Sequence, residues 1–223
     1  MKFNEAQEQA IRHIDGPCLV LAGPGSGKTA VITDRTRYLI EEAGIHPANI
    51  LVVTFTKAAA MEMQERFRTK MQGANVPCTF GTFHSIFFWI LRRAYGYTGN
   101  QIVSEEEKRK ILTELVQKME LEYEDEEEFI QNLIGEITLV KSEYMPIEHY
   151  YSTTCGEVEF RQLYQSYQER IQSEGKLDFD DMILCCYELF SQRQDILNAW
   201  RRKFVYILVD EFQDINLIQW KIM

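Results

Sequence analysis

The sequence of 223 residues predicts an α/β protein in which a parallel β-sheet is interrupted by an inserted all-helical subdomain. Three observations predict this fold class. Short apolar runs typical of buried strands alternate with helix-compatible segments in the first 91 residues. The middle of the chain has helical periodicity without a strand pattern. A further apolar run near residue 207 returns to the strand pattern.

A glycine-rich motif follows the first predicted strand, Cys18–Ala22. It fits the pattern G-x-x-x-x-G-K-T, and a helix-compatible run, Thr29–Glu42, continues from it. Glycines let successive N–H groups point at a phosphate chain, and the helix N-terminus adds partial positive charge. We therefore predict a nucleotide-binding site formed by Ala22, Gly23, Pro24, Gly25, Ser26, Gly27, Lys28 and Thr29.

The chemistry of this site is predicted from four residues. Lys28 is placed to reach the β- and γ-phosphates, and the Thr29 hydroxyl is placed to ligate Mg²⁺. The apolar strand Val205–Val209 ends in Asp210 and Glu211. Asp210 would hold Mg²⁺, commonly through water, and Glu211 would orient and deprotonate the attacking water.

Two more strands are predicted before the helical segment. Ile50–Phe55 reads as a buried strand that runs into the helix-favouring residues 56–66, and residues 76–80 form a shorter one. An apolar helix, Ile86–Arg93, follows. Alternation of strand and helix indicates a parallel sheet, which places Phe55 at the carboxyl edge where open α/β sheets bind ligands.

Residues 92–175 form the predicted inserted subdomain, with helices expected at 105–119, 126–142 and 157–174. This segment holds 18 Asp and Glu against nine Lys and Arg, whereas the rest of the chain holds 16 against 15. The acidity is therefore concentrated in the middle, where charge runs are expected at helix starts and solvated faces. A basic path for nucleic acid elsewhere on the molecule is not excluded.

Composition restricts the compartment and the class of site. No apolar run approaches the ~18–20 residues of a membrane span, and the N-terminus lacks the apolar core of a signal peptide. Five cysteines without a C-x-x-C pair argue against a disulfide framework and against a zinc site. We expect a cytoplasmic protein without a membrane partner.

Six motifs occur in a defined order: FNEAQEQAI, AGPGSGKT, TFTKAAAMEM, GTFHS, LDFDD and LVDEFQDIN. With them the chain resembles superfamily 1A DNA helicases of the UvrD/Rep/PcrA type over nearly its whole length. The resemblance implies a RecA-like P-loop NTPase lobe, domain 1A, at residues 1–91 and 176–223. It also implies that residues 92–175 are the family's helical insert, domain 1B.

The resemblance also implies roles for individual residues. Gln7 looks like the glutamine that reads adenine, and Gln213 like the residue that senses the γ-phosphate or its water. The implied catalytic set is thus Lys28, Asp210, Glu211 and Gln213, with ATP and Mg²⁺ as cofactors. Contacts to single-stranded DNA, including stacking of an aromatic ring on a base, are implied for Thr54, Phe55, Thr56, Thr82, Phe83 and His84.

The implied activity is that of an ATP-dependent 3′→5′ DNA helicase or translocase acting in repair, replication or recombination. Its partners would be single-stranded DNA and junctions of single- and double-stranded DNA. The motifs of the family's second lobe, including an arginine finger, do not occur in these 223 residues. We therefore expect this piece to bind nucleotide weakly without turning it over, and to need the C-terminal lobe of the same protein.

Two alternatives remain at this point. Ala30 and Lys57-Ala58 depart from the usual UvrD pattern, and GSGKTAV and TFTKAAA look closer to AddA-type helicase–nucleases. A nucleotide-dependent switch without motor activity is the alternative from a different class. The strand-contact motifs have no evident purpose in such a switch, and this favours the helicase.

Overall fold

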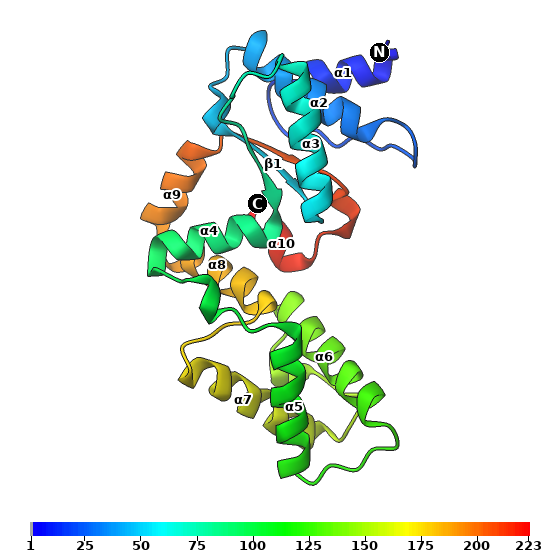
Figure 1. Ribbon diagram of the computed structural model, residues 1–223, viewed down its shortest axis with the longest axis vertical. Helices are drawn as coiled ribbons and strands as arrows, with labels where there is room; N and C mark the ends of the chain where they lie inside the picture. The colour runs from blue at the N-terminus through cyan, green and yellow to red at the C-terminus, as the bar shows by residue number, and fades with distance from the viewer. Residues whose placement is uncertain (1) are drawn as a thin grey trace. The chain divides into compact units, whose positions relative to one another are not determined.

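The computed structural model describes residues 2–223. They divide into two compact units (Figure 1). Unit 1 runs up to Ile86 and resumes at Arg193–Asp214, and unit 2 comprises Phe87–Gln192 and Ile215–Met223. Helix α4, Phe83–Tyr95, begins in unit 1 and ends in unit 2.

Unit 1 is built on a parallel β-sheet. Among the described residues three strands form it, in the order β2-β1-β3. Their bounds are Ile50–Thr54 for β1, Thr79–Thr82 for β2 and Tyr206–Val209 for β3. In β1, Val53 lies opposite Gly81 of β2 and Val209 of β3, and both pairings are parallel. The predicted α/β class with a parallel sheet is confirmed.

Helices pack against this sheet. The bounds in unit 1 are Glu5–Arg12 for α1, Lys28–Glu41 for α2, Lys57–Lys70 for α3 and Gln194–Lys203 for α9, with 3-10 turns at Pro47–Asn49 (η1) and Phe212–Asp214 (η4). Ile50 and Val52, on one face of β1, share a core with Leu39 of α2 and with Met63 and Phe67 of α3. Every residue of β1 is buried, as expected of a strand with a neighbour on each side.

The segment Cys18–Ala22 is not a strand, and its prediction as one is wrong. Leu19 is 69% exposed and Leu21 is 90% exposed. A strand needs a neighbour to pair its N–H and C=O groups. Within the described residues β1 already has both neighbours, and none of the strands pairs with Cys18–Ala22. An apolar run is compatible with a buried strand, but it does not supply the partner that a strand needs.

Unit 2 is helical, as predicted for the middle of the chain. Its bounds are Gly99–Gln101 (η2), Glu105–Lys118 (α5), Glu126–Ser142 (α6), Ile147–His149 (η3), Glu157–Ser173 (α7), Phe179–Gln192 (α8) and Leu217–Ile222 (α10). Apolar side chains of α5, α6 and α7, such as Leu112, Leu133 and Leu163, form one core. The three helices predicted in the insert are confirmed to within one residue. Among the described residues, no helix combines the length and apolar character needed to cross a membrane.

The chain enters and leaves the α5–α7 core at one place. The N–H of Val103 donates to the carbonyl of Leu177 at 2.9 Å, and the N–H of Leu177 donates to the carbonyl of Gln101 at 2.9 Å. This short parallel bridge holds the segment before α5 beside the segment after α7. An inserted subdomain needs its two ends to meet in this way. The boundaries 92–175 remain a prediction, since unit 2 also includes residues on either side of them.

Two buried lysines meet three aspartates in unit 2. Lys141 Nζ lies 2.7 Å from a carboxylate oxygen of Asp178 and 2.7 Å from one of Asp181. Lys108 Nζ lies 3.2 Å from Asp180. The lysines come from α6 and α5, and the aspartates lie at the start of α8, where Asp178 caps the helix by accepting from the N–H of Asp181. This charge cluster therefore joins three helices.

We expect Asp178→Asn to destabilise unit 2 by about 3–5 kcal/mol, because two buried lysines would each lose one of their carboxylate partners, and Lys141 would keep only Asp181. Chemical denaturation followed by far-UV circular dichroism measures this loss. The matched control is Glu157→Gln, which breaks an exposed ion pair with Arg161 and should cost less than about 1 kcal/mol. Equal effects of the two substitutions would contradict the structural role of the cluster.

The difference between wild type and Asp178→Asn should also depend on pH. Burial opposes ionisation of Asp178, but Lys141 and Lys108 outweigh it and hold the pKa of this carboxyl below its ordinary value. A lowered pKa contributes stability above the unfolded-state pKa of about 4, and this contribution falls as the pH drops toward the folded-state value. Denaturation curves recorded between neutral and acidic pH should therefore converge on the acidic side.

Candidate functional site

The glycine-rich loop lies in unit 1 and leads directly into α2. Gly25 and Gly27 have φ angles of 72° and 82°, which residues with a Cβ adopt only with strain. Gly27 caps α2 without a side-chain hydrogen bond, and the helix begins at Lys28. The N–H groups of the first turn are thus available to an anion, and the helix dipole favours one there. The loop geometry fits the predicted phosphate site.

Gln7 contacts this loop. Asn4 caps α1 and Gln7 is its third helical residue, with each side chain bonded to the other's backbone N–H. Gln7 Nε2 also donates to the carbonyl of Ser26 at 2.9 Å. Both ends of the Gln7 amide are therefore engaged, one within α1 and one with the loop. Recognition of adenine by Gln7 stays a prediction. To bond the adenine edge, the Gln7 amide would have to give up one of these two hydrogen bonds.

Lys28 forms an ion pair with Glu211. Lys28 Nζ lies 2.8 Å from Glu211 Oε2, and both side chains are about one-third exposed. This hydrogen bond raises the pKa of Lys28 and lowers the pKa of Glu211. The two residues are 183 positions apart in the sequence, and the fold brings them into contact. The two halves of the predicted nucleotide site therefore lie in one place.

Asp210 lies beside this pair but is buried. Its N–H donates to the carbonyl of Val53 at 2.9 Å, which continues the pairing of β3 with β1. Burial, followed by repulsion from Glu211, raises the pKa of the Asp210 carboxyl, while Lys28 and a hydrogen bond with the Thr54 side chain oppose this rise. A buried carboxyl held in this way is costly to ionise without a cation. The site therefore favours a cation near Asp210.

Gln213 contacts the same carboxylate as Lys28. Its Nε2 donates to Glu211 Oε2 at 2.7 Å and lies 3.3 Å from Asp214 Oδ2. Glu211 has a φ of 52°, in the left-handed region that is uncommon for a residue with a Cβ. This turn points the Glu211 side chain at Lys28. The acid, the lysine and the glutamine thus form a small polar network at the end of β3.

The turn after β1 carries the first set of predicted DNA contacts. Thr54 ends the strand and is buried against Asp210. Thr56 caps α3, because its hydroxyl accepts from the N–H of Ala59 at 3.1 Å. Phe55, between them, is half-buried. Of these three side chains, Phe55 is therefore the one placed to offer a ring face, while Thr54 and Thr56 are engaged in holding the turn.

The second set lies after β2. Thr82 and Ser85 exchange hydrogen bonds that start α4, and His84 is half-buried. Phe83 is buried and meets Phe55 edge to face, with ring centroids 5.7 Å apart. Phe83 thus packs edge to face against the Phe55 ring and restricts its position. Its assignment to direct strand contact stays a prediction, as does that of Thr82 and His84.

The residues present fit a magnesium–nucleotide. Backbone N–H groups and Lys28 suit phosphate oxygens, and the Thr29 hydroxyl and Asp210 carboxylate suit Mg²⁺. The described residues contain no group of three or more His, Cys, Asp or Glu that could hold a metal alone. A magnesium ion here would therefore take its remaining ligands from phosphate and water, which is its usual preference.

Two features of the site were missed by sequence reasoning. Thr54 was assigned to DNA, yet it contacts Asp210. The register of β1 and β3, with Val53 opposite Val209, places these two residues together, but register requires the three-dimensional pairing. The contact of Gln7 with Ser26 is not predictable from the sequence, because the residue type of a polar surface side chain does not indicate which group it will bond.

Comparison with known proteins gives consistent results. The family model described as "UvrD/REP helicase N-terminal domain" matches residues 3–223. The chain is 39% identical to the putative ATP-dependent DNA helicase YjcD of Bacillus subtilis, covering 99% of this chain and 30% of that protein. It is 33% identical to the ATP-dependent DNA helicase Rep of Escherichia coli, covering 100% and 34%. It is also 33% identical to the B. subtilis helicase PcrA, covering 99% and 30%. The chain thus spans about one-third of the length of these relatives.

We expect Gln7→Ala to loosen the glycine-rich loop, because the bond from Gln7 to Ser26 anchors it to α1. Hydrogen exchange at the amides of Gly25–Lys28 should quicken up to about tenfold, the effect of one bond worth ~1 kcal/mol. Asn4→Ala is the matched control, since it removes the cap of α1 and leaves the bond to Ser26. If both variants exchange alike, the loop is not anchored by Gln7.

Proposed function

Because the chain belongs to the UvrD/REP helicase N-terminal domain family, we propose that it is the ATP-binding N-terminal part of an ATP-dependent DNA helicase. The single observation that carries this proposal is the contact of Lys28 with Glu211 at 2.8 Å, beside Asp210. It unites a phosphate-binding loop and a pair of acids at the carboxyl edge of a parallel sheet, where such folds bind nucleotides. The whole protein would translocate 3′→5′ on single-stranded DNA in repair, replication or recombination.

In this proposal Lys28 changes partner when ATP and Mg²⁺ bind. Its ammonium leaves Glu211 for the β- and γ-phosphate oxygens, which the loop N–H groups also contact. Thr29 and Asp210 would hold Mg²⁺, which would supply charge neutralisation at the phosphates. Glu211, released from Lys28, orients the attacking water and accepts its proton. Gln213, already bonded to Glu211, is placed to follow the position of that water.

The proposed DNA path crosses unit 1 at the turns after β1 and β2. Phe55 offers its ring to a base, and the buried Phe83 keeps that ring in place. The charge balance agrees with this location. Unit 1 holds 12 Asp and Glu against 13 Lys and Arg, and unit 2 holds 22 against 11. A phosphate backbone is repelled less by the near-neutral unit 1.

We propose that the 223 residues alone bind nucleotide without sustained turnover. In phosphoryl transfer, an arginine finger from a second element contributes about 10³–10⁵ in rate. Among the described residues, Lys28 is the cation that forms an ion pair with the acids at the end of β3. Hydrolysis and unwinding, together with any grip on junction DNA by the helical unit, would belong to the full-length protein with its second lobe.

We expect Lys28→Ala in the full-length protein to weaken ATP binding at least tenfold, because a charge-assisted hydrogen bond is worth ~1.5–3 kcal/mol. Isothermal titration with MgATP measures the affinity. Glu211→Gln is the control, since it also breaks the ion pair but leaves the lysine free for phosphate. It should retain ATP binding and lose hydrolysis. Tight ATP binding by Lys28→Ala would contradict the phosphate-loop assignment.

We expect Phe55→Ala in the full-length protein to reduce affinity for single-stranded DNA by ~1–3 kcal/mol, the worth of one stacked base. DNA-stimulated ATPase activity should fall with it, while ATP binding persists. Fluorescence anisotropy with a labelled oligonucleotide measures the affinity. Tyr151→Ala removes an exposed aromatic ring of unit 2 and should have no effect. Unchanged DNA affinity in Phe55→Ala would remove this ring from the DNA path.

A further inference from the structure

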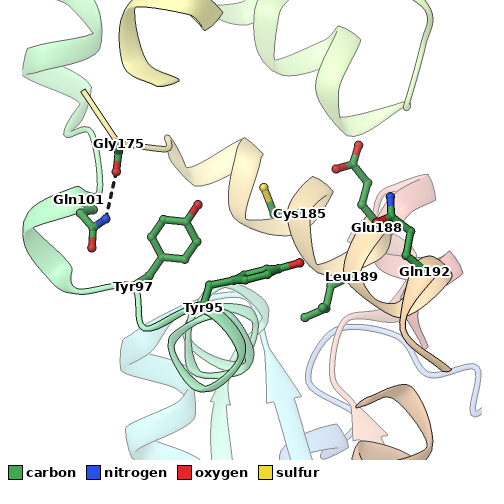
Figure 2. A pocket seen from close by; sticks show the side chains of 8 residues that line it. All are labelled: Tyr95, Tyr97, Gln101, Gly175, Cys185, Glu188, Leu189 and Gln192. Atoms are coloured by element: carbon green, nitrogen blue, oxygen red, sulfur yellow. Dashed lines mark hydrogen bonds between the residues drawn. The ribbon is translucent and has the colours of Figure 1, made fainter. Parts of the chain in front are cut away.

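Unit 2 contains a cleft that the proposed helicase chemistry does not use. It has a volume of about 480 Å³ and lies between the segment that follows α4 and one face of α8. Figure 2 shows the rings of Tyr95 and Tyr97 on one side, with Cys185, Glu188, Leu189 and Gln192 from α8 on the other. Its size lies in the range of sites that hold small molecules or several side chains.

The α8 wall presents one continuous stripe. Its lining residues recur at helical spacing, positions 185, 188, 189 and 192, which places them on one face over two turns. Leu189 is buried and gives this wall an apolar base, while Glu188 is exposed. The opposite wall is aromatic: Tyr95 and Tyr97 meet edge to face at 6.1 Å, and Tyr95 is 59% exposed. The cleft therefore offers a ligand one exposed aromatic ring and one exposed carboxylate.

Glu188 supplies the charge of this cleft. No lysine or arginine is among the lining residues, and among the ion pairs of the described residues none involves Glu188. Arg92 and Arg93 belong to the same helix as Tyr95 but do not line the cleft. Burial raises the pKa of Cys185 to about 12, so its thiol is neutral at physiological pH. The cleft thus combines one negative charge with two neutral aromatic rings.

We propose that this cleft binds an arginine side chain of a basic segment of a protein partner. A guanidinium is planar and can stack on the Tyr95 ring while donating two hydrogen bonds to the Glu188 carboxylate. The surrounding charge is complementary, because unit 2 holds 22 Asp and Glu against 11 Lys and Arg. A lysine ammonium would satisfy the charge but has no plane to stack on the ring.

The same charges disfavour nucleic acid as the occupant. A base stacked between the tyrosines would bring its phosphate close to Glu188, in a unit with a net charge of −11. Electrostatic attraction contributes most of the affinity of proteins for DNA, and here the field opposes it. The negative potential of unit 2 instead attracts a basic protein segment.

The test is a titration of the 223-residue chain with N-acetyl-glycyl-arginyl-glycinamide, followed by ¹H–¹⁵N nuclear magnetic resonance. The control peptide carries citrulline, which has the shape of arginine without its charge. Shift changes should be confined to amides of residues 95–97 and 185–192, including the Gln192 side chain, and should weaken as salt rises. Equal binding of the citrulline peptide would overturn the proposal.

Two pairs of variants locate the interaction. Glu188→Gln should weaken arginine binding about tenfold, the effect of losing a charge-assisted bond. Glu169→Gln removes an exposed carboxylate of α7 outside the cleft and should leave binding unchanged. Tyr95→Phe should retain binding and Tyr95→Ala should lose most of it, because the ring face makes the contact. Equal affinity of Glu188→Gln and Glu169→Gln would overturn the proposal.

A thymidine decamer serves as the nucleic-acid probe in the same titration. The proposal expects no shift changes at the cleft residues. Tighter binding of the decamer than of the arginine peptide at these residues, strengthened by Glu188→Gln, would assign the cleft to DNA and overturn the proposal. This result would leave the proposed helicase function intact, because the nucleotide site and Phe55 lie in unit 1.

Discussion

Parallel pairing of β1 with both of its neighbours is the constraint on which the site depends. The register places Thr54 beside Thr82 and Val53 beside Val209. Because the three strands run in one direction, the turns that follow them meet at one edge of the sheet. Phe55, Phe83 and Asp210 are thereby brought together although their motifs are far apart in the sequence. The nucleotide acids and the aromatic pair are neighbours for this reason.

Neighbouring turns give a physical basis for coupling between the proposed nucleotide site and the proposed DNA path. Thr54 hydrogen-bonds Asp210 with its side chain, and the next residue is Phe55, whose ring rests on Phe83. A change in the charge near Asp210 therefore acts on the residue that precedes the proposed stacking ring. Two sites linked through one short turn can bias each other by differences in contact energy. Such coupling is what a nucleotide-driven motor on single-stranded DNA requires.

Much of this arrangement follows from sequence pattern, and the exceptions share one cause. Ile50–Thr54 and the helices of unit 2 were predictable because apolar periodicity is a local property. The sequence predicts that Lys28 and Glu211 belong to one site, because their motifs define its two halves, but it does not predict the ion pair between them. The strand expected at Cys18–Ala22 failed because strand formation depends on a partner elsewhere in the chain. The cleft lined by Tyr95 and α8 is likewise non-local, since only the fold brings its walls together.

Two of the protein's lysine–acid ion pairs, Lys141–Asp178 and Lys28–Glu211, differ in burial, and this difference separates a structural pair from one proposed to act in the mechanism. Lys141 and Asp178 are almost fully buried, so removing either partner leaves the other with one counter-charge fewer in the interior, at a cost of about 3–5 kcal/mol. Lys28 and Glu211 are each about one-third exposed, so solvent screening weakens their ion pair. Water can solvate the Lys28 ammonium and the Glu211 carboxylate when the ion pair separates. Lys28 is therefore able to leave Glu211 for a phosphate, whereas Lys141 stays with Asp178 while unit 2 is folded.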